Sequence, residues 1–326
     1  MNEFGIIDKY FNWEGNDSIS IGVGDDAAII QISEGKQLVT SVDTSIVNVH
    51  FPEDTAPYAI AFKSLAVNIS DIAAMGGIPR WFTLALTLPE QSEVWLSGFS
   101  KGLKACANAF NVNLIGGDTT SGELSITITI YGEIDQSRAL LRNGAKPNDM
   151  IYVTGNVGDA AGGLYALSKA NASLPDANSH LKNLIQQLNL PFPRLTESKM
   201  IKEFASSCID ISDGLIQDLG HVISQSKCSA QLDINKIPLS EALLSIYPRE
   251  QCQAFACYGG DDYELLFTVS ANKVEHFERQ YDEIKKTNPS LAKITRIGKI
   301  TQCQDDIVNI RNQEGADIPL KGYQHF

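Results

Sequence analysis

The chain has 326 residues, of which 43% are hydrophobic and 20% are charged. These fractions are ordinary for a globular protein and exclude a disordered or collagen-like chain. The length favours two domains and can bury a substantial core. Acidic residues outnumber basic ones by 39 to 26, which gives a net charge of −13. Since this charge repels phosphate backbones, we expect no nucleic-acid partner and no membrane partner.

The sequence shows no sign of export or membrane insertion. The six cysteines form no C-x-x-C pair and are sparse for this length, so neither a zinc site nor a disulfide scaffold is expected. The N-terminal stretch lacks a basic region followed by an apolar one, and no run approaches the roughly 20 apolar residues of a membrane-spanning helix. We therefore expect a cytoplasmic protein.

Strand and helix patterns alternate along the first half of the chain. The predicted elements are strands at 19–22 and 37–42, a helix at 57–75, a strand at 81–88, a helix at 93–110, and strands at 114–115 and 125–131. The helix at 57–75 is closed by a Gly-Gly-Ile-Pro stop signal at 76–79. Turn-forming residues at 144–149 indicate a boundary, so we expect domains at 1–145 and 146–326.

The second half continues with short strands and helices. The predicted elements are a strand at 150–154, a helix from 160, a loop with a short helix at 171–193, a helix at 197–205, a strand at 208–211, a helix at 215–224 and a strand at 264–269. The turn Gly155-x-x-Gly158 lies between the first strand and the first helix of this half. It could hold a phosphate at the helix N-terminus or be a tight turn, and it matches neither the P-loop nor the Rossmann fingerprint.

Aspartates recur where predicted strands end and turns begin. The motifs are Gly-Asp-Asp-Ala at 24–27, Val-Asp-Thr at 42–44, Gly-Gly-Asp-Thr at 116–119 and Asp-Ile-Ser-Asp-Gly at 210–214. A single aspartate in such a place is usually a turn former or a helix cap. Four recurrences, most with flanking glycines, favour instead a shared crevice in which carboxylates bind hard cations such as Mg²⁺. Part of the acidic excess would then be functional, and the rest would be surface charge for solubility.

Three isolated residues add to this pattern. Asp71 lies inside the apolar helix pattern, where burial is costly unless the carboxylate is paired or bound to metal; the alternative is a solvent-facing stripe. Asn68 precedes it by three residues and shares its face of the helix. Arg142 is either a solvated surface residue or a residue that binds an ATP phosphate with both ends of its guanidinium group. His50 is the sole histidine of the first half, which disfavours histidine-based nucleophilic catalysis.

Eight motifs in a fixed order resemble the thiamine-monophosphate kinase family, part of the superfamily of aminoimidazole ribonucleotide synthetase. They lie at 22–28, 41–44, 63–77, 116–119, 153–155, 191–195, 210–215 and 259–265. The similarity extends from residue 4 to the last residues, 322–326. A single Gly-Asp-Asp is weak as a signal, whereas this ordered set is specific.

The resemblance implies a two-domain α/β (α+β) subunit with the fold of aminoimidazole ribonucleotide synthetase. Residues 1–145 would bind metal and ATP and pair in a homodimer, and residues 146–326 would form a C-terminal α/β domain. The implied activity is direct, in-line transfer of the ATP γ-phosphoryl group to thiamine monophosphate, with several Mg²⁺ ions as cofactors. The products would be thiamine diphosphate and ADP, formed without a phosphoenzyme, a catalytic nucleophile or a general base.

The resemblance also implies roles for individual residues. The metal-site positions are Asp26, Ser41, Val42, Asp43, Asp71, Asp118, Asp210 and Asp213. The ATP-contacting positions are Gly117, Asp118, Arg142 and Ser212, and the substrate-contacting positions are His50, Asp261 and Tyr323. Val42 could offer only its backbone carbonyl, and Asp261 stands where the family usually has glutamate.

Two other functions stay open at this point. An aminoimidazole ribonucleotide synthetase-like ligase or cyclase would share most of the motifs. A non-catalytic acidic cation-binding protein would be expected to carry contiguous calcium loops, which the sequence lacks. Selenophosphate synthetase would need a reactive cysteine near the N-terminus, but the first cysteine is Cys106. The hydrogenase-maturation relative would need a C-terminal cysteine, where this chain ends in His325-Phe326.

Overall fold

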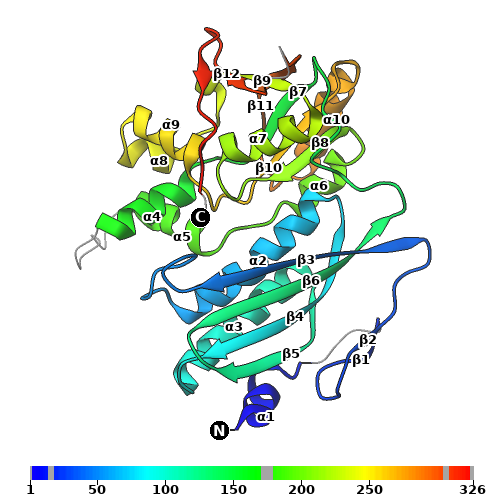
Figure 1. The fold of residues 1–326 in the computed structure, drawn as a ribbon, viewed down its shortest axis with the longest axis vertical. Helices are drawn as coiled ribbons and strands as arrows, with labels where there is room; N and C mark the ends of the chain where they lie inside the picture. Colours follow the sequence, from blue (N-terminus) through cyan, green and yellow to red (C-terminus); the bar gives the residue numbers. More distant parts are fainter. Residues whose placement is uncertain (1, 14–17, 170–178, 304–307, 324–326) are drawn as a thin grey trace. The chain divides into compact units, whose positions relative to one another are not determined.

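The computed structural model describes residues 2–13, 18–169, 179–303 and 308–323 (Figure 1). The chain forms two compact units, Met1–Ala73 with Gly77–Arg138, and Ala74–Gly76 with Ala139–Phe326. The division after Arg138 comes before the turn at 144–149, because Leu140 and Ala145 are buried in the core of the second unit. The functions expected for 1–145 and 146–326 stay predictions.

The first unit is built on a four-stranded sheet. Its strands are β3 (Lys36–Ile46), β4 (Ile78–Leu88), β5 (Asn113–Ser121) and β6 (Ser125–Asp135), in the order β3-β6-β4-β5. Strands β4 and β5 run parallel, and the other two pairs are antiparallel. Helices α2 (Pro57–Ala74) and α3 (Glu93–Phe110) cover one face of this sheet (Figure 1). The short elements α1 (Glu3–Ile6), η1 (Ile7–Phe11), β1 (Ile19–Ile21) and β2 (Ile29–Ile30) precede them.

The core of the first unit lies between the sheet and its helices. In β6, Ile126, Ile128 and Ile130 are fully buried and alternate with partly exposed threonines, as in a strand with one buried face. Ile72 of α2 packs against this strand, since a β-carbon added to Gly132 would lie 3.1 Å from the Ile72 side chain. The sheet therefore turns one face toward α2 and the other face outward.

The second unit contains a seven-stranded mixed sheet. Its strands are β7 (Met150–Thr154), β8 (Ala205–Asp210), β9 (Ser229–Leu232), β10 (Leu265–Val269), β11 (Ile294–Thr301), β12 (Ile310–Arg311) and β13 (Asp317–Ile318), in the order β13-β12-β9-β11-β7-β10-β8. The helices are α4 (Asp159–Lys169), α5 (Ser179–Asn189), α6 (Leu195–Ile201), α7 (Leu215–Ser226), α8 (Glu241–Ile246), α9 (Arg249–Tyr258) and α10 (Val274–Thr287), with 3₁₀ turns η2 (Ile234–Lys236) and η3 (Ala271–Lys273).

Both faces of this second sheet are covered. In β7, Ile151 and Val153 belong to one hydrophobic cluster together with α7, whereas Tyr152 belongs to a second cluster together with α6 and α10. Successive strand residues point to opposite faces, so the two clusters lie on opposite sides of the sheet. Burial on both faces explains why β10 is apolar along its whole length, with all five residues buried. The mixed α/β architecture confirms the predicted fold class.

Strands β3 and β5 extend beyond their predicted ends, and β6 continues past its predicted end at 131 to Asp135. Strand β3 continues through Asp43 to Ile46, because its pairing with β6 includes Asp43 opposite Ile128. Strand β5 continues through the Gly-Gly-Asp segment to Ser121, because Asp118 pairs with Ala85 of β4. The glycines and aspartates that signal turns in isolation are held in the ladder by neighbouring strands.

The region predicted as a loop at 171–193 and the helix predicted at 197–205 also differ. Helix α5 occupies Ser179–Asn189, longer than the short helix expected, while residues 170–178 lie outside the described residues. Helix α6 ends at Ile201, and Ala205 already begins β8. The C-terminal pair His325-Phe326 also lies outside the described residues. Among the helices described, none combines the length and apolar character that crossing a membrane requires.

Candidate functional site

Three predicted metal-site residues meet between β3 and α2. Ser41 and Asp43 lie two residues apart on β3, so both side chains point toward the helix-covered face. Ser41 Oγ donates a hydrogen bond of 2.5 Å to Asp71 Oδ2 on α2. Asp43 is also hydrogen-bonded to Asp71; burial, and after it the charge of Asp71, raises the pKa of Asp43 to about 7. Two carboxyl groups this close need a shared proton or a cation between them.

The surroundings of this cluster fit the sequence reasoning. Asp71 is partly buried and hydrogen-bonded, so it is not part of a solvent-facing stripe. Asn68 is fully buried, donates to Ser64 O at 3.0 Å, and leaves its Oδ1 without a hydrogen-bond partner. Val42 points to the opposite face of β3 and is 58% exposed, which leaves its backbone carbonyl as the group it could offer. His50 closes the turn after β3, where its Nδ1 accepts a hydrogen bond from Ile46 N at 3.1 Å.

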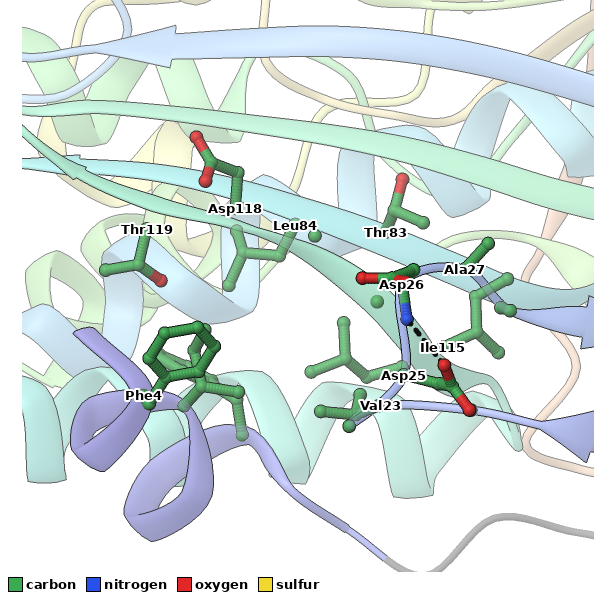
Figure 2. A pocket seen from close by; sticks show the side chains of 18 of the residues that line it. Phe4, Val23, Asp25, Asp26, Ala27, Thr83, Leu84, Ile115, Asp118 and Thr119 are labelled. Atoms are coloured by element: carbon green, nitrogen blue, oxygen red, sulfur yellow. Dashed lines mark hydrogen bonds between the residues drawn. The ribbon is translucent and has the colours of Figure 1, made fainter.

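Three further predicted residues line one pocket of the first unit. Asp26, Gly117 and Asp118 border a cavity of about 530 Å³ (Figure 2). The Gly24-Asp25-Asp26 loop forms one wall, where Asp26 N donates to Asp25 Oδ1 at 2.9 Å. Apolar residues of the N-terminal helical turns, Phe4 among them, form another wall. Phe4 is 76% exposed, so the pocket combines an accessible aromatic face with carboxylates.

The local structure of β5 explains how Asp118 comes to border this pocket. Phe82 pairs with Leu114 and Thr83 with Gly116, so Ile115 is an extra residue that bulges from the ladder. Such bulges change the direction of the side chains that follow, and they are common beside functional sites. Gly117 must be glycine, because an added β-carbon would lie 1.8 Å from Leu84 O.

The two groups of residues in the first unit lie at opposite edges of one sheet. Asp43 pairs with Ile128, Ile128 with Leu84, and Leu84 with Gly117, so Asp43 and Gly117 share one row across the four strands. Three strand spacings amount to about 14 Å. A Mg²⁺ ion binds its oxygens at about 2.1 Å, so Asp43 and Asp118 of one chain do not share an ion.

The second unit brings a further group together at the start of α7. Asp210 ends β8 and is 4% exposed, and Ser212 and Asp213 lie in the short turn that follows. Gly214 caps α7 with a φ of 121°, a conformation that favours glycine. Asp261 N donates to Ser212 O at 2.9 Å, and Tyr323 N donates to Asp213 O at 3.1 Å. The predicted residues at 210–213, 261 and 323 are therefore neighbours.

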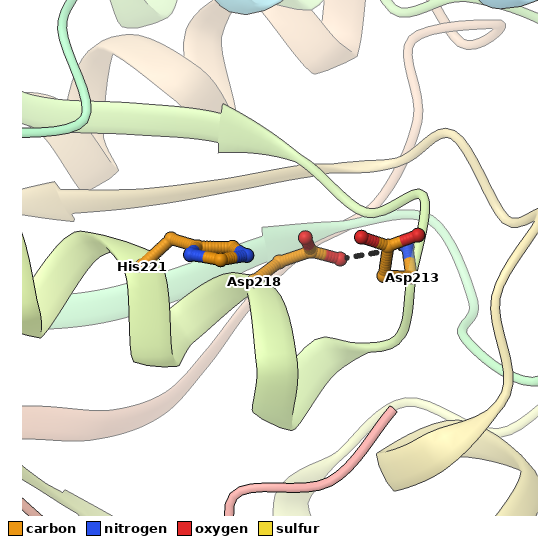
Figure 3. Close-up of side chains that lie close together, drawn as sticks. All are labelled: Asp213, Asp218 and His221. Carbon is orange, nitrogen blue, oxygen red and sulfur yellow. Dashed lines mark hydrogen bonds between the residues drawn. The ribbon is translucent and has the colours of Figure 1, made fainter. Parts of the chain in front are cut away.

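Sequence reasoning missed two residues of this group, Asp218 and His221. Ligand atoms of Asp213, Asp218 and His221 lie within 4.8 Å of one another, and Asp218 lies between the other two (Figure 3). Asp218 Oδ2 accepts the backbone N–H groups of residues 212, 213 and 214, each at 3.1 Å. Burial raises the pKa of Asp218 to about 8, helped by the charges of Asp210 and Asp213. The sequence offered one signal for Asp218: it is an acidic residue in the first turn of the predicted helix, where it can accept hydrogen bonds from backbone N–H groups.

The Gly155–Gly158 turn resolves in favour of its structural interpretation. Asp262 Oδ2 accepts Gly158 N at 2.8 Å, so a carboxylate of the chain already occupies the N-terminus of α4. Gly155 has a φ of 57°, and an added β-carbon would lie 1.9 Å from Glu264 Oε1. The glycines thus serve close packing. Arg142 is exposed in the second unit, and its role in ATP binding stays a prediction.

Comparison with known proteins identifies the family. Residues 24–134 match the family described as AIR synthase related protein, N-terminal domain. The chain is 42% identical to the thiamine-monophosphate kinase of Buchnera aphidicola subsp. Schizaphis graminum, covering 100% of this chain and 99% of the relative. It superposes on the crystal structure of thiamine-monophosphate kinase from Stenotrophomonas maltophilia K279a with a TM-score of 0.83 and 39% identity, over 91% of this chain and 92% of the other.

A second solved structure is that of AaThiL complexed with AMPPCP and TMP. It matches with a TM-score of 0.75 and 30% identity over 93% of this chain and 92% of the other. Full-length coverage at these identities shows common descent over both units. The chain belongs to the thiamine-monophosphate kinase family.

Proposed function

We propose that this protein transfers the γ-phosphoryl group of ATP to thiamine monophosphate and releases thiamine diphosphate and ADP. The observation that carries the proposal is the full-length similarity to AaThiL, whose structure holds the ATP analogue AMPPCP together with TMP. The aspartates of this chain supply the chemistry that such a reaction needs, because both reactants are polyanions. The ligase or cyclase and the non-catalytic cation-binding protein are not favoured by these relatives.

Several Mg²⁺ ions are the proposed cofactors. Ser41, Asp43 and Asp71 offer a hydroxyl and two carboxylates in contact, an all-oxygen donor set of the kind that Mg²⁺ prefers. The raised pKa of Asp43 supports this fit, since a cation beside the pair would let both carboxylates ionise. We propose further metal contacts for the remaining predicted positions, Asp26, Asp118, Asp210, Asp213 and the Val42 carbonyl.

For ATP, we propose contacts by Gly117, Asp118, Arg142 and Ser212. The pocket beside Gly117 and Asp118 supports this assignment, because its apolar wall suits a flat adenine ring and its acidic wall suits metal-bound phosphates. For thiamine monophosphate, we propose contacts by His50, Asp261 and Tyr323. Asp261 adopts a φ of 70°, and its Oδ1 accepts a hydrogen bond from Tyr263 at 3.0 Å. The aspartate side chain is shorter than that of the usual glutamate, so a bridging water would connect it to thiamine monophosphate.

The proposed mechanism needs no covalent intermediate. The acceptor is a phosphate oxygen of thiamine monophosphate, which is already ionised near neutral pH, so a general base is unnecessary. This oxygen bonds to the γ-phosphorus as the bond to the β–γ bridging oxygen breaks, and ADP leaves with that electron pair. Bound Mg²⁺ would neutralise the charge of the two polyanions. The side chains contribute by holding the reactants in line.

We also propose a homodimer formed by the first units of two copies. The outward face of β3 carries Leu38, Val42 and Ile46, which are 49%, 58% and 41% exposed. Asp43 and Asp118 lie at opposite edges of one sheet, so a shared metal site needs the β5 edge of one copy beside the β3 edge of another. A two-fold dimer would create two such sites.

A cytoplasmic location is proposed because ATP is the co-substrate and all six cysteines are free.

The test is direct. Purified protein is incubated with Mg-ATP and thiamine monophosphate, and thiamine diphosphate and ADP are quantified by chromatography. We expect equimolar formation of both products. Turnover of formylglycinamidine ribonucleotide without thiamine diphosphate formation would overturn the proposal.

A variant links this activity to the carboxylate cluster. Asp71→Asn keeps the shape of the side chain but removes its charge, so we expect kcat to fall by about 100-fold or more. Asp54→Asn, which changes an exposed carboxylate before α2, is the matched control and should leave kcat unchanged. Near-normal turnover of Asp71→Asn at low Mg²⁺ would remove Asp71 from the metal site.

A further inference from the structure

Gln217, in the first turn of α7, joins two parts of the second unit through one nitrogen. Its Nε2 donates to Asp213 Oδ2 at 3.2 Å and to Tyr323 O at 2.7 Å. A primary amide carries two N–H groups, so both hydrogen bonds can form at once. The first bond goes to a carboxylate oxygen and the second to a backbone carbonyl oxygen. Gln217 thus fixes a side chain on one side and a backbone on the other.

The segment that carries Tyr323 lies tightly against this turn of α7. A β-carbon added to Gly322 would lie 2.5 Å from Gln217 Oε1 and 2.7 Å from Asp213 O. Three residues further along the helix, a β-carbon added to Gly220 would lie 3.4 Å from the Leu320 side chain. Residues 320–323 therefore follow the surface of α7 from Gly220 toward Asp213. Glycine at 322 is required for this approach.

Both backbone groups of Tyr323 are engaged by this contact. Its N–H donates to Asp213 O at 3.1 Å, and its carbonyl accepts from Gln217. Asp213 is held in turn through its own N–H by Asp218, which is 2% exposed. The Asp213 backbone, the Asp213 carboxylate and the Tyr323 backbone therefore form one hydrogen-bonded unit. The Gln217 side chain links the carboxylate to segment 320–323.

We propose that Gln217 is a positioning residue that couples the Asp213 carboxylate to Tyr323. The inference rests on the proposed function, in which Asp213 is a metal-site residue and Tyr323 contacts thiamine monophosphate. Cation binding that orders Asp213 orders Gln217, and through it the segment that carries Tyr323. A bound cation would thereby increase the affinity for thiamine monophosphate by some factor. By thermodynamic linkage, thiamine monophosphate increases the affinity for the cation by the same factor.

Gln217→Met tests the link, because methionine has a similar length and shape but no N–H donor. Loss of both hydrogen bonds, one to a carboxylate and one to a backbone carbonyl, should raise the KM for thiamine monophosphate about ten-fold. We expect kcat to change much less than KM, since the proposed role of Gln217 is to hold segment 320–323 and not to contact the transferred phosphoryl group. Gln225→Met is the matched control, an exposed glutamine on the same helix, and it should match the wild-type protein. An unchanged KM in Gln217→Met would overturn the proposal.

A double-mutant cycle separates positioning from general damage. In a Tyr323→Ala background the tyrosine ring is already gone, so adding Gln217→Met should raise KM by less than about two-fold. If Gln217→Met raises KM ten-fold in both backgrounds, its effect does not pass through Tyr323 and the proposal fails. Thermal unfolding of each variant shows whether the fold is intact.

Hydrogen exchange tests the contact without substrate. In Gln217→Met, the amides of residues 320–323 should exchange about ten-fold faster than in the wild type, and those in Gln225→Met should not change. Equal exchange in the two variants would contradict the contact. This readout also separates two failures: if the wild-type protein forms no thiamine diphosphate, the proposed function is wrong, while exchange still reports whether Gln217 holds the segment.

Discussion

Asp43 shows how a single residue reports the chemistry of its surroundings. Its carboxyl touches that of Asp71, and burial with this neighbouring charge raises its pKa to about 7. An acid whose pKa is raised by folding binds more protons in the folded state than in the unfolded state. Between its ordinary value of 3.8 and about 7, the metal-free protein therefore loses stability as the pH rises. A divalent cation beside the pair would reverse this loss.

This sign gives a prediction for thermal unfolding. In EDTA, the Tm should fall by about 3 °C or more between pH 5 and pH 8, and Mg²⁺ should raise the Tm more at pH 8 than at pH 5. The pKa values of Asp159 and Asp218 are also raised, so these residues steepen the fall of Tm with pH in the wild type and in the variant alike. Comparison with Asp43→Asn isolates the contribution of Asp43, because the variant should show a flatter dependence. Equal slopes with and without Asp43 would contradict the assignment.

Elements with local signals were predictable from the sequence. Helix α3 spans the predicted 93–110, because Ser92 caps its first turn and Asn111 ends it in the left-handed conformation with a φ of 54°. Strand β7 likewise matches its predicted range, 150–154. The ends of β3 and β5 were not predictable, because pairing with β6 and β4 holds Asp43 and Asp118 in the ladder. The grouping of Asp218 with Asp213 was missed because it depends on the turn that brings them together.

A buried ion pair fastens α6 to the ends of two strands. Arg194, which precedes α6, forms a two-fold hydrogen-bonded pair with Glu264, with Nε donating to Oε2 at 2.7 Å. Thr154, the last residue of β7, donates to the same carboxylate at 2.5 Å. The exposed fractions of the two charged side chains are 20% and 5%. Glu264 is thus shielded from water and depends on Arg194 for its countercharge.

Arg194→Met should therefore destabilise the protein by about 3–5 kcal/mol, since it leaves a buried carboxylate unpaired. The measurement is the free energy of unfolding in urea. The control is Arg311→Met, which removes a pair with Asp317 whose side chains are 41% and 70% exposed, and should cost about 0–1 kcal/mol. A second change, Glu264→Gln, should recover part of the loss in Arg194→Met. If Arg194→Met and Arg311→Met lower the free energy of unfolding equally, burial of the Arg194–Glu264 pair does not matter for stability.

For the whole molecule, the central question is how six predicted metal-site aspartates cooperate. The chain carries a net charge of −13, and these six carboxylates lie on strands, in turns and, for Asp71, on helix α2. In the first unit they form two groups at opposite edges of one sheet, Asp26 with Asp118 and Asp43 with Asp71. Neither group is a complete site by itself if each Mg²⁺ needs ligands from both. A second copy supplies the missing edge in the proposed dimer.

Dimerisation itself should depend on the outward face of β3. Val42→Lys places a charge on that face and should convert the protein to monomers in sedimentation velocity experiments. Val94→Lys changes a residue of α3 that is 85% exposed, and should leave the association state unchanged. A monomeric wild-type protein, or a dimer that survives Val42→Lys and Val94→Lys alike, would contradict this interface.

Mixing two inactive variants tests whether the site is shared. Asp43→Asn and Asp118→Asn should each abolish turnover as homodimers, because every shared site then lacks one carboxylate. A mixed dimer would place both changes in one site and none in the other. Since random mixing makes half of the dimers mixed, activity should recover to about a quarter of the wild-type value after exchange of subunits. If both groups served a site within one chain, no site in the mixture would be intact. Persistent inactivity after demonstrated subunit exchange would therefore assign the site to a single chain.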